Sequence, residues 1–176
     1  MKKVIKPALL GVVTVFMVLI NIQYSNAHQW WKWHWDKSTL GVGIWNCTSE
    51  GNSARYDWDV HTDLSLPLKN YHTDVSGDCQ NYGNTGWGGL ATIEDDSFDF
   101  WHCFAWCRIE HAHAVVNNYY SSNSTSWWRR KGVYCQEFGH TFGLDHSNTG
   151  DCMGLSYYNN ISTTGPHNWS DINSMY

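Results

Sequence analysis

Basic residues are scarce in this chain of 176 residues: 11 lysines and arginines stand against 16 aspartates and glutamates, and the formal net charge is −5. The basic residues form no stripe along the sequence. Proteins that bind nucleic acids or anionic membrane surfaces usually carry such a stripe, because it neutralises phosphate charge. The composition therefore argues against nucleic acid and against an anionic membrane surface as partners.

Long apolar runs are also scarce. The run Ala8–Ile20 is short for a membrane-spanning helix, which needs about 20 residues. It is flanked by Lys2, Lys3 and Lys6 before it and by Ser25-Asn26-Ala27 after it. A basic start, an apolar run and small residues in this order indicate a secretory signal peptide, with a membrane anchor as the alternative. We expect residues 1–27 to be removed and residues 28–176 to form one secreted domain without stable membrane association.

Six cysteines lie in the expected secreted part: Cys47, Cys79, Cys103, Cys107, Cys135 and Cys152. An even number of cysteines in an exported chain is typical of a disulfide framework. Six cysteines allow 15 pairings, and the sequence alone does not choose among them. Zinc binding by Cys103 and Cys107 is disfavoured because no second pair of this spacing accompanies them.

One short segment carries residues suited to metal chemistry, and it begins at Gln136. Gln136 and His140 are one helical turn apart, so their side chains lie on the same helix face. Glu137 follows Gln136 and is placed to act as a general base. Gly143 can adopt a left-handed backbone conformation, which would end the helix and bring His146 back as a third ligand. The segment predicts a zinc site; an amphipathic helix with two incidental histidines is the alternative.

This segment resembles the long motif of the metzincin zinc endopeptidases, H-E-x-x-H-x-x-G-x-x-H, except that Gln136 stands at the first histidine. Met153 matches the methionine of the turn that follows the motif in this family, the Met-turn. The serine after His146 makes the segment most similar to the matrixins. The specific resemblance covers about residues 130–155, and the closing stretch that ends in Tyr176 resembles the last helix of matrixin domains.

The resemblance implies a fold and a site. The fold is α+β of the metzincin (zincin) type, with a twisted mixed β-sheet, two long helices and a small C-terminal subdomain. The metal ligands are Gln136, His140 and His146, and Glu137 is the general base. The family fold brings Cys135 and Cys152 together beneath the metal, so we expect a disulfide between them. Cys47–Cys79 and Cys103–Cys107 then remain as the other pairs.

Glutamine can take the place of the first histidine in a zinc site. Its amide oxygen projects about as far from the backbone as the distal nitrogen of histidine, and it is equally neutral. A bound metal would therefore keep its full charge and its effect on water. An amide carbonyl is a poorer zinc donor than imidazole, so we expect weaker metal binding at Gln136.

The other elements are predicted from periodicity and from the same resemblance. They are a strand over 42–47, a helix over Ser53–Leu64 by analogy with metzincins, a short strand near His72–Val75 within the loop Tyr71–Gly89, a glycine-led edge strand over Gly86–Ile93, and a strand over Ile109–Asn117. Trp31, Trp33 and Trp35 alternate as in a strand with one aromatic face. Core filling is the favoured role for these tryptophans, and a stacking platform for glycan or extended substrate is the alternative.

Two further groups offer metal ligands. His111 and His113 lie on one face of the predicted strand and could replace the missing first ligand, but hydrogen-bonded imidazoles on a polar face are the favoured interpretation. An acidic loop follows the edge strand, with carboxylates that suit calcium. Its residues are Glu94, Asp95, Asp96 and Asp99. Because they show no ordered ligand spacing, a solvated loop is favoured over a structural Ca²⁺ site.

The sequence thus predicts a secreted, monomeric zinc metalloendopeptidase that acts on protein or peptide substrates. The alternative is a catalytically inactive metzincin-like protein that binds glycan or protein through its tryptophans. Glu137 favours the enzyme, because an inactive site has no need of that carboxylate, whereas Gln136 favours the binding protein. Another zinc hydrolase, such as an amidase acting on cell-wall peptide, is a third hypothesis.

Overall fold

The computed structural model describes residues 33–94, 107–121, 126–154 and 161–176. The predicted signal peptide, the carboxylates of Asp95, Asp96 and Asp99, and the predicted partner of Cys107, Cys103, lie outside these ranges. No helix among the described residues has both the length and the apolar character needed to cross a membrane.

The main sheet has four strands in the order β2-β3-β6-β4. Their bounds are Val42–Trp45 for β2, Val75–Gln80 for β3, His111–Asn117 for β6 and Gly89–Glu94 for β4. The first three strands are parallel to one another, and β4 is antiparallel to β6 at one edge. The expected α+β class with a mixed sheet is confirmed, and the glycine-led strand lies at the edge, as predicted.

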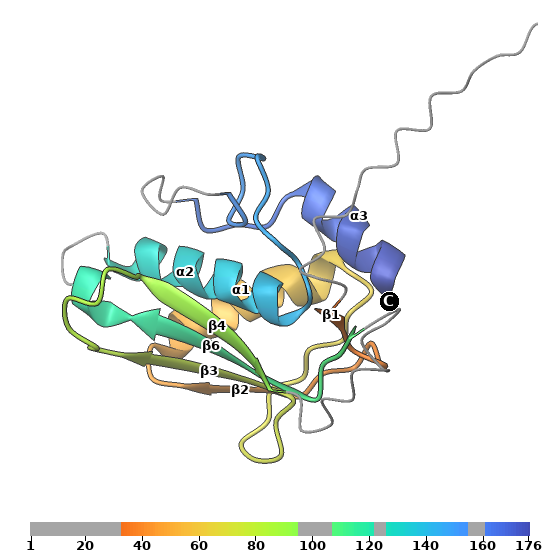
Figure 1. Ribbon diagram of the computed structural model, residues 1–176, viewed down its shortest axis with the longest axis horizontal. Coiled ribbons are helices and arrows are strands. Elements are labelled where there is room, and N and C mark those ends of the chain that lie inside the picture. Colours follow the sequence, from red (N-terminus) through yellow and green to blue (C-terminus); the bar gives the residue numbers. More distant parts are fainter. Residues whose placement is uncertain (1–32, 95–106, 122–125, 155–160) are drawn as a thin grey trace, which may run out of the picture.

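Two long helices, α1 (Thr48–His61) and α2 (Ser126–Thr141), lie on the same side of this sheet (Figure 1). The indole nitrogen of the buried Trp58 in α1 donates a hydrogen bond of 3.0 Å to the carbonyl of Cys135 in α2. Small residues let α2 approach the sheet closely: a Cβ at Gly77 would lie 3.0 Å from the Tyr134 ring and 3.1 Å from the Phe138 ring. The core therefore lies between the sheet and these two helices.

The strand β6 follows the predicted alternation. Ala112, Ala114 and Val116 are fully buried, whereas His111 and His113 are partly exposed. Ala114 pairs in register with Gly77, which faces α2. Paired residues of neighbouring strands point to the same face, so the alanines face α2 and the two histidines lie on the opposite face of the sheet.

The helix expected over Ser53–Leu64 is present as α1 but begins at Thr48 and ends at His61. Its polar first turn is held by tertiary contacts, since Cys47 is disulfide-bonded and a Cβ at Gly51 would lie 2.7 Å from Ile44. The hydroxyl of Thr62 donates a 2.7 Å hydrogen bond to the carbonyl of Trp58 where the helix ends. Of these contacts, the disulfide to Cys79 comes from a distant part of the chain, so local sequence alone did not give the start of the helix.

The prediction of a short strand near His72–Val75 was wrong in its position. The strand β3 begins at Val75 and continues to Gln80, through residues that the sequence analysis assigned to a loop. Serine, glycine and aspartate favour strands weakly. However, β3 is hydrogen-bonded to β2 on one side and to β6 on the other, so its neighbours determine its length.

A second sheet joins β1 (Trp33–His34) in parallel to β5 (Cys107–Arg108). The predicted aromatic strand is therefore short. Trp35, just beyond it, is 2% exposed and donates from its indole nitrogen to the carbonyl of Thr141 at 2.8 Å. Core filling, the favoured role, is confirmed for Trp35.

Two disulfides lie within the described residues. Cys47–Cys79 joins the start of α1 to β3, with an S–S distance of 2.07 Å. Cys135–Cys152 joins α2 to the turn that carries Met153, with an S–S distance of 2.00 Å. Both pairs are those expected from the resemblance.

The chain closes on α3 (Pro166–Met175), which begins at a proline and is followed by Tyr176. The hydroxyl of Tyr176 donates to the carbonyl of Phe142 at 2.8 Å and accepts a hydrogen bond from the backbone nitrogen of Trp35 at 3.2 Å. Burial raises the pKa of this phenol well above its ordinary value, so it stays neutral. The last residue thus satisfies a carbonyl at the C-terminal end of α2 and holds the N-terminal segment against it.

Candidate metal and active site

The end of α2 is shaped by Gly143. Its φ is +95°, and a Cβ at this position would overlap the carbonyl oxygen of Trp33. Gly143 N donates to His140 O and Leu144 N donates to Gly139 O, both at 3.0 Å. This is the hydrogen-bond pattern of a Schellman helix end, which requires a left-handed residue. The chain turns at this glycine, as the sequence analysis expected, and returns toward the helix.

The turn brings two imidazoles together. Nε2 of His140 lies 3.3 Å from Nε2 of His146, and the two rings are nearly perpendicular at 87°. The other nitrogen of His140, Nδ1, lies 2.8 Å from the carbonyl of Leu144. Because a carbonyl only accepts hydrogen bonds, Nδ1 carries the proton and Nε2 presents its lone pair. Burial lowers the pKa of His140, and the adjacent His146 lowers it further, so the ring is neutral at neutral pH.

This arrangement fits a zinc ion. Zinc–nitrogen bonds of 2.0–2.1 Å in a tetrahedral site separate two ligand atoms by about 3.3 Å. The two Nε2 atoms have this separation. The hydrogen bond from Nδ1 of His140 is also the type of outer contact that orients a metal-ligating histidine.

Gln136 lies one turn before His140 and is 3% exposed. Its side-chain nitrogen donates a 3.0 Å hydrogen bond to the carbonyl of Gly154, one residue past Met153. Within the described part of the chain, no residue donates a hydrogen bond to its side-chain oxygen. The amide is thus fixed through its nitrogen, and its oxygen is the atom left to serve as a ligand.

Glu137 faces the edge strand β4. The residue is 2% exposed, and a Cβ at Gly89 would overlap its Oε1 atom, so this close approach requires glycine. Oε1 has no hydrogen-bond partner among the described residues. Burial raises the pKa of Glu137 to about 8, against the opposing effect of a backbone hydrogen bond from Ala91. The group can therefore take and release a proton near neutral pH.

Met153 lies directly beneath α2. It is fully buried, and a Cβ at Gly139 would overlap its sulfur. The carboxylate of Asp151 accepts a hydrogen bond from Met153 N at 2.9 Å, and also bonds to the hydroxyls of Ser147 and Thr149. Ser147 N in turn donates to Met153 O at 2.8 Å. These bonds tie the Met153 turn to the residue after His146, so the turn and the segment that carries His146 are held together.

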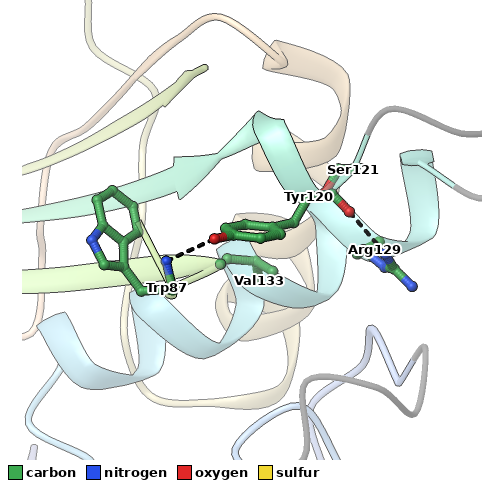
Figure 2. A pocket seen from close by; sticks show the side chains of 7 residues that line it. Trp87, Tyr120, Ser121, Arg129 and Val133 are labelled. Carbon is green, nitrogen blue, oxygen red and sulfur yellow. Dashed lines mark hydrogen bonds between the residues drawn. The ribbon is translucent and has the colours of Figure 1, made fainter. Parts of the chain in front are cut away.

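A pocket of about 160 Å³ lies beside the start of β4. It is lined by Gly86, Trp87, Gly88, Tyr120, Ser121, Arg129 and Val133. Figure 2 shows the Tyr120 ring between Trp87 and Arg129, with Val133 of α2 beside it. Val133 is one helical turn before Glu137, on the same face of α2. The sequence analysis singled out the glycines before β4 but missed the pocket, because Tyr120 and Arg129 join it only through the fold.

The structure does not place His111 and His113 near α2. They lie on the opposite face of the sheet, so the idea that they replace a missing ligand beside His140 was wrong. His113 is instead hydrogen-bonded to Ser76 through Nδ1 and lies 3.1 Å from Glu94 through Nε2. The histidines lie on a partly exposed face, and His113 is hydrogen-bonded, as the favoured interpretation expects.

Comparison with known proteins gives little further information. The sequence matches no protein-family model and no curated protein. A solved structure of myroilysin is similar over 64% of this chain and 52% of that chain, with 14% sequence identity and a TM-score of 0.43. This chain spans about half the length of that structure. A similarity this distant supports no conclusion about activity, which must come from the site.

Proposed function

We propose that this chain is a secreted zinc-dependent endopeptidase whose metal is held by Gln136, His140 and His146. The observation that carries the proposal is the 3.3 Å separation of the two imidazole Nε2 atoms beside a buried glutamate. When bound, zinc supplies a Lewis acid that lowers the pKa of water and polarises a peptide carbonyl. The matrixin-like motif supports the same proposal, as do the disulfides, which are typical of exported proteins.

The edge strand β4 offers a binding site for an extended peptide. Among the described strands, β4 pairs only with β6, so its other edge is available for a further strand. Main-chain hydrogen bonds to an edge strand bind a peptide largely independently of its sequence. Because Glu137 packs against Gly89 of this strand, a peptide bound there would pass close to its carboxylate.

Glu137 acts as the general base and then as the general acid. Its carboxylate accepts a proton from water and gives that proton to the leaving amine. The two steps return the carboxylate to its starting state. Burial also keeps bulk water from competing for the proton.

The pocket at Trp87 determines which substrate side chains the proposed enzyme prefers. Its walls include two aromatic rings and Val133, and Arg129 donates a 2.8 Å hydrogen bond to the carbonyl of Tyr120 at its rim. An apolar or aromatic side chain of a peptide bound along β4 would fit these walls. We therefore propose substrates with a large apolar residue near the cleaved bond.

The test is cleavage of a diverse peptide mixture by the exported chain with zinc supplied, with products identified by mass. Glu137→Gln should abolish the cuts, while Glu110→Gln, the same change at a carboxylate paired with Arg108, should leave them unchanged. Cuts that persist in Glu137→Gln would show a contaminating protease and refute the assigned base.

The second candidate is an inactive relative that binds its target without cutting it. It is favoured by the hydrogen bond from Gln136 to Gly154, which gives glutamine a structural role independent of metal. If the native chain cuts nothing, Gln136→His decides between the candidates. Restored cleavage would indicate a decayed enzyme, and continued silence would favour the binding protein.

A further inference from the structure

A second group of metal-binding side chains lies on the outer face of the sheet. Glu94, the last residue of β4, is directly opposite His111 of β6, and Thr92 is opposite His113. Glu94 is therefore also the diagonal neighbour of His113 on the same face. This face is opposite to the one that α2 covers, so the group is separate from the imidazole pair at the end of the helix.

The distances within this group suit a metal ion. The Oε1 atom of Glu94 lies 3.1 Å from Nε2 of His113, and its Oε2 atom lies 3.5 Å from Nδ1 of His111. Each residue offers one ligand atom such that all of them lie within 4.8 Å of one another. Ligand atoms of a tetrahedral zinc site are separated by about 3.3 Å. The contact between Oε1 of Glu94 and Nε2 of His113 already has nearly this length, and His111 lies against the other oxygen of the same carboxylate. Small rotations of the partly exposed side chains can shorten the remaining separations, which are at most 4.8 Å.

Ser76 of β3 gives the group an outer contact. Its hydroxyl is hydrogen-bonded to Nδ1 of His113, and the residue is 8% exposed. Nε2 of His113 faces the Glu94 carboxylate, which only accepts hydrogen bonds, so without a metal Nε2 carries the proton and Nδ1 accepts from the Ser76 hydroxyl. A metal would take the place of the Nε2 proton, and Nδ1–H would then donate to Ser76. Metal-ligating histidines almost always have such a partner on the second ring nitrogen.

Ion pairing alone explains the group poorly. The histidine side chains are each 34% exposed and Glu94 is 58% exposed, and exposed pairs of this kind contribute at most about 1 kcal/mol. The two imidazole rings meet edge to face at 84°. Together with the carboxylate they offer three ligand groups, whereas an ion pair uses only two groups. The exposure also leaves a path for an ion and room for a water as fourth ligand.

We propose that Glu94, His111 and His113 bind a divalent transition-metal ion of the zinc class, as a site of its own. Two imidazoles and a carboxylate suit zinc, nickel and copper better than calcium or magnesium. The ion links the end of the edge strand β4 to β6 and so fixes the strand at that end. The proposal goes beyond the endopeptidase function and does not depend on it.

The test separates the two sites by mutation and uses zinc alone as the probe, with Co²⁺ as a spectroscopic substitute. In a His140→Ala/His146→Ala chain, equilibrium dialysis should find one equivalent of zinc, and Co²⁺ should give a ligand-field spectrum. Adding His111→Ala and His113→Ala should remove both signals. His72→Ala, at an exposed histidine of a loop, is the matched control and should change neither.

Ser76→Ala should weaken zinc binding about 10- to 100-fold while all three ligands remain. A folded His140→Ala/His146→Ala chain that takes up no zinc would overturn the proposal, as would uptake that survives the loss of His111 and His113. If the double variant fails to fold, His113→Ala in the native chain must lower the total zinc by one equivalent, and an unchanged total would overturn the proposal. A failed peptide-cleavage test affects none of these readouts.

Discussion

The two histidine pairs of this protein are built in opposite ways. His140 and His146 meet through a helix end, where Gly143 reverses the chain and burial keeps His140 neutral. His111 and His113 meet through the period-two alternation of one strand and remain partly exposed beside a carboxylate. The buried pair thus depends on one special backbone conformation, whereas the exposed pair depends only on strand register. The first is suited to chemistry and the second to holding an ion in place.

The largest expected difference between the pairs is in peptide cleavage. His140→Ala should lower the rate at least about 100-fold, because it removes a proposed ligand beside Glu137. His113→Ala should leave most of the activity, since its side chain is on the other face of the sheet. Rates on one peptide substrate at saturating zinc provide the comparison. Equal losses in both variants would show that the outer face also controls catalysis.

The burial of Glu137 should appear as a pH-dependent cost to stability in the metal-free protein. Its pKa is raised from 4.5 to about 8 on folding, so the folded state binds its proton more tightly than the unfolded state. Its contribution to stability is fully present below pH 4.5 and is lost as the pH rises through about 8. Glu137→Gln should therefore stabilise the fold at pH 8.5 by about 4 kcal/mol relative to its effect at pH 4.5.

Urea unfolding in the presence of a chelator, at both pH values, measures this difference. Glu110→Gln is the control for losing a carboxylate elsewhere in the fold. If Glu137→Gln changes the free energy of unfolding equally at both pH values, the carboxylate of Glu137 is solvated in solution rather than buried.

Sequence reasoning succeeded where a short local rule was enough. The spacing of Gln136, His140 and His146, with glycine at 143, predicted the imidazole pair. Alternation over Ile109–Asn117 predicted that His111 and His113 share one face of the strand, but not which side of the sheet that face is on. Sequence reasoning failed where residues far apart in the sequence determine the local structure. The strand β3 was missed because its pairing with β2 and β6 overrides its polar sequence.

The contacts around the sites were equally invisible in the sequence. The hydrogen bond from Gln136 to Gly154 and the approach of Glu94 to the histidines both join segments that only the fold brings together. The pocket at Trp87 combines residues of a loop, η2 (Asn118–Ser121) and α2 for the same reason.

Gly143 tests whether the buried pair depends on its helix end. In Gly143→Ala, the alanine must adopt a left-handed φ of +95°, and its Cβ would overlap the carbonyl oxygen of Trp33. We expect this substitution to destabilise the fold by about 2 to 3 kcal/mol. Gly86→Ala has a φ of +84° but open space around it, and should cost about 1 kcal/mol. Gly150→Ala has neither problem and is the control.

Chemical denaturation measures the three changes, and zinc binding shows where each acts. Gly143→Ala should weaken the site at His140 and His146 while the Co²⁺ spectrum of the outer site persists. If Gly143→Ala lowers the free energy of unfolding no more than Gly86→Ala does, the overlap with Trp33 is relieved at little cost. The position of His146 beside His140 then does not depend on glycine at the helix end.

The smallest effect concerns the one ligand position at which the buried site departs from the metzincin motif. Gln136→His replaces an amide oxygen by a better zinc donor but removes the hydrogen bond to Gly154, which contributes about 1 kcal/mol. The gain in donor strength should exceed this loss, so we expect zinc to bind about tenfold more tightly, or about 1.4 kcal/mol. Competition with a chelator measures the affinity, and Gln80→His, which adds a histidine at an exposed strand end, is the matched control. An unchanged affinity would mean that position 136 does not contact the metal, and that this glutamine serves only to hold the Met153 turn against α2.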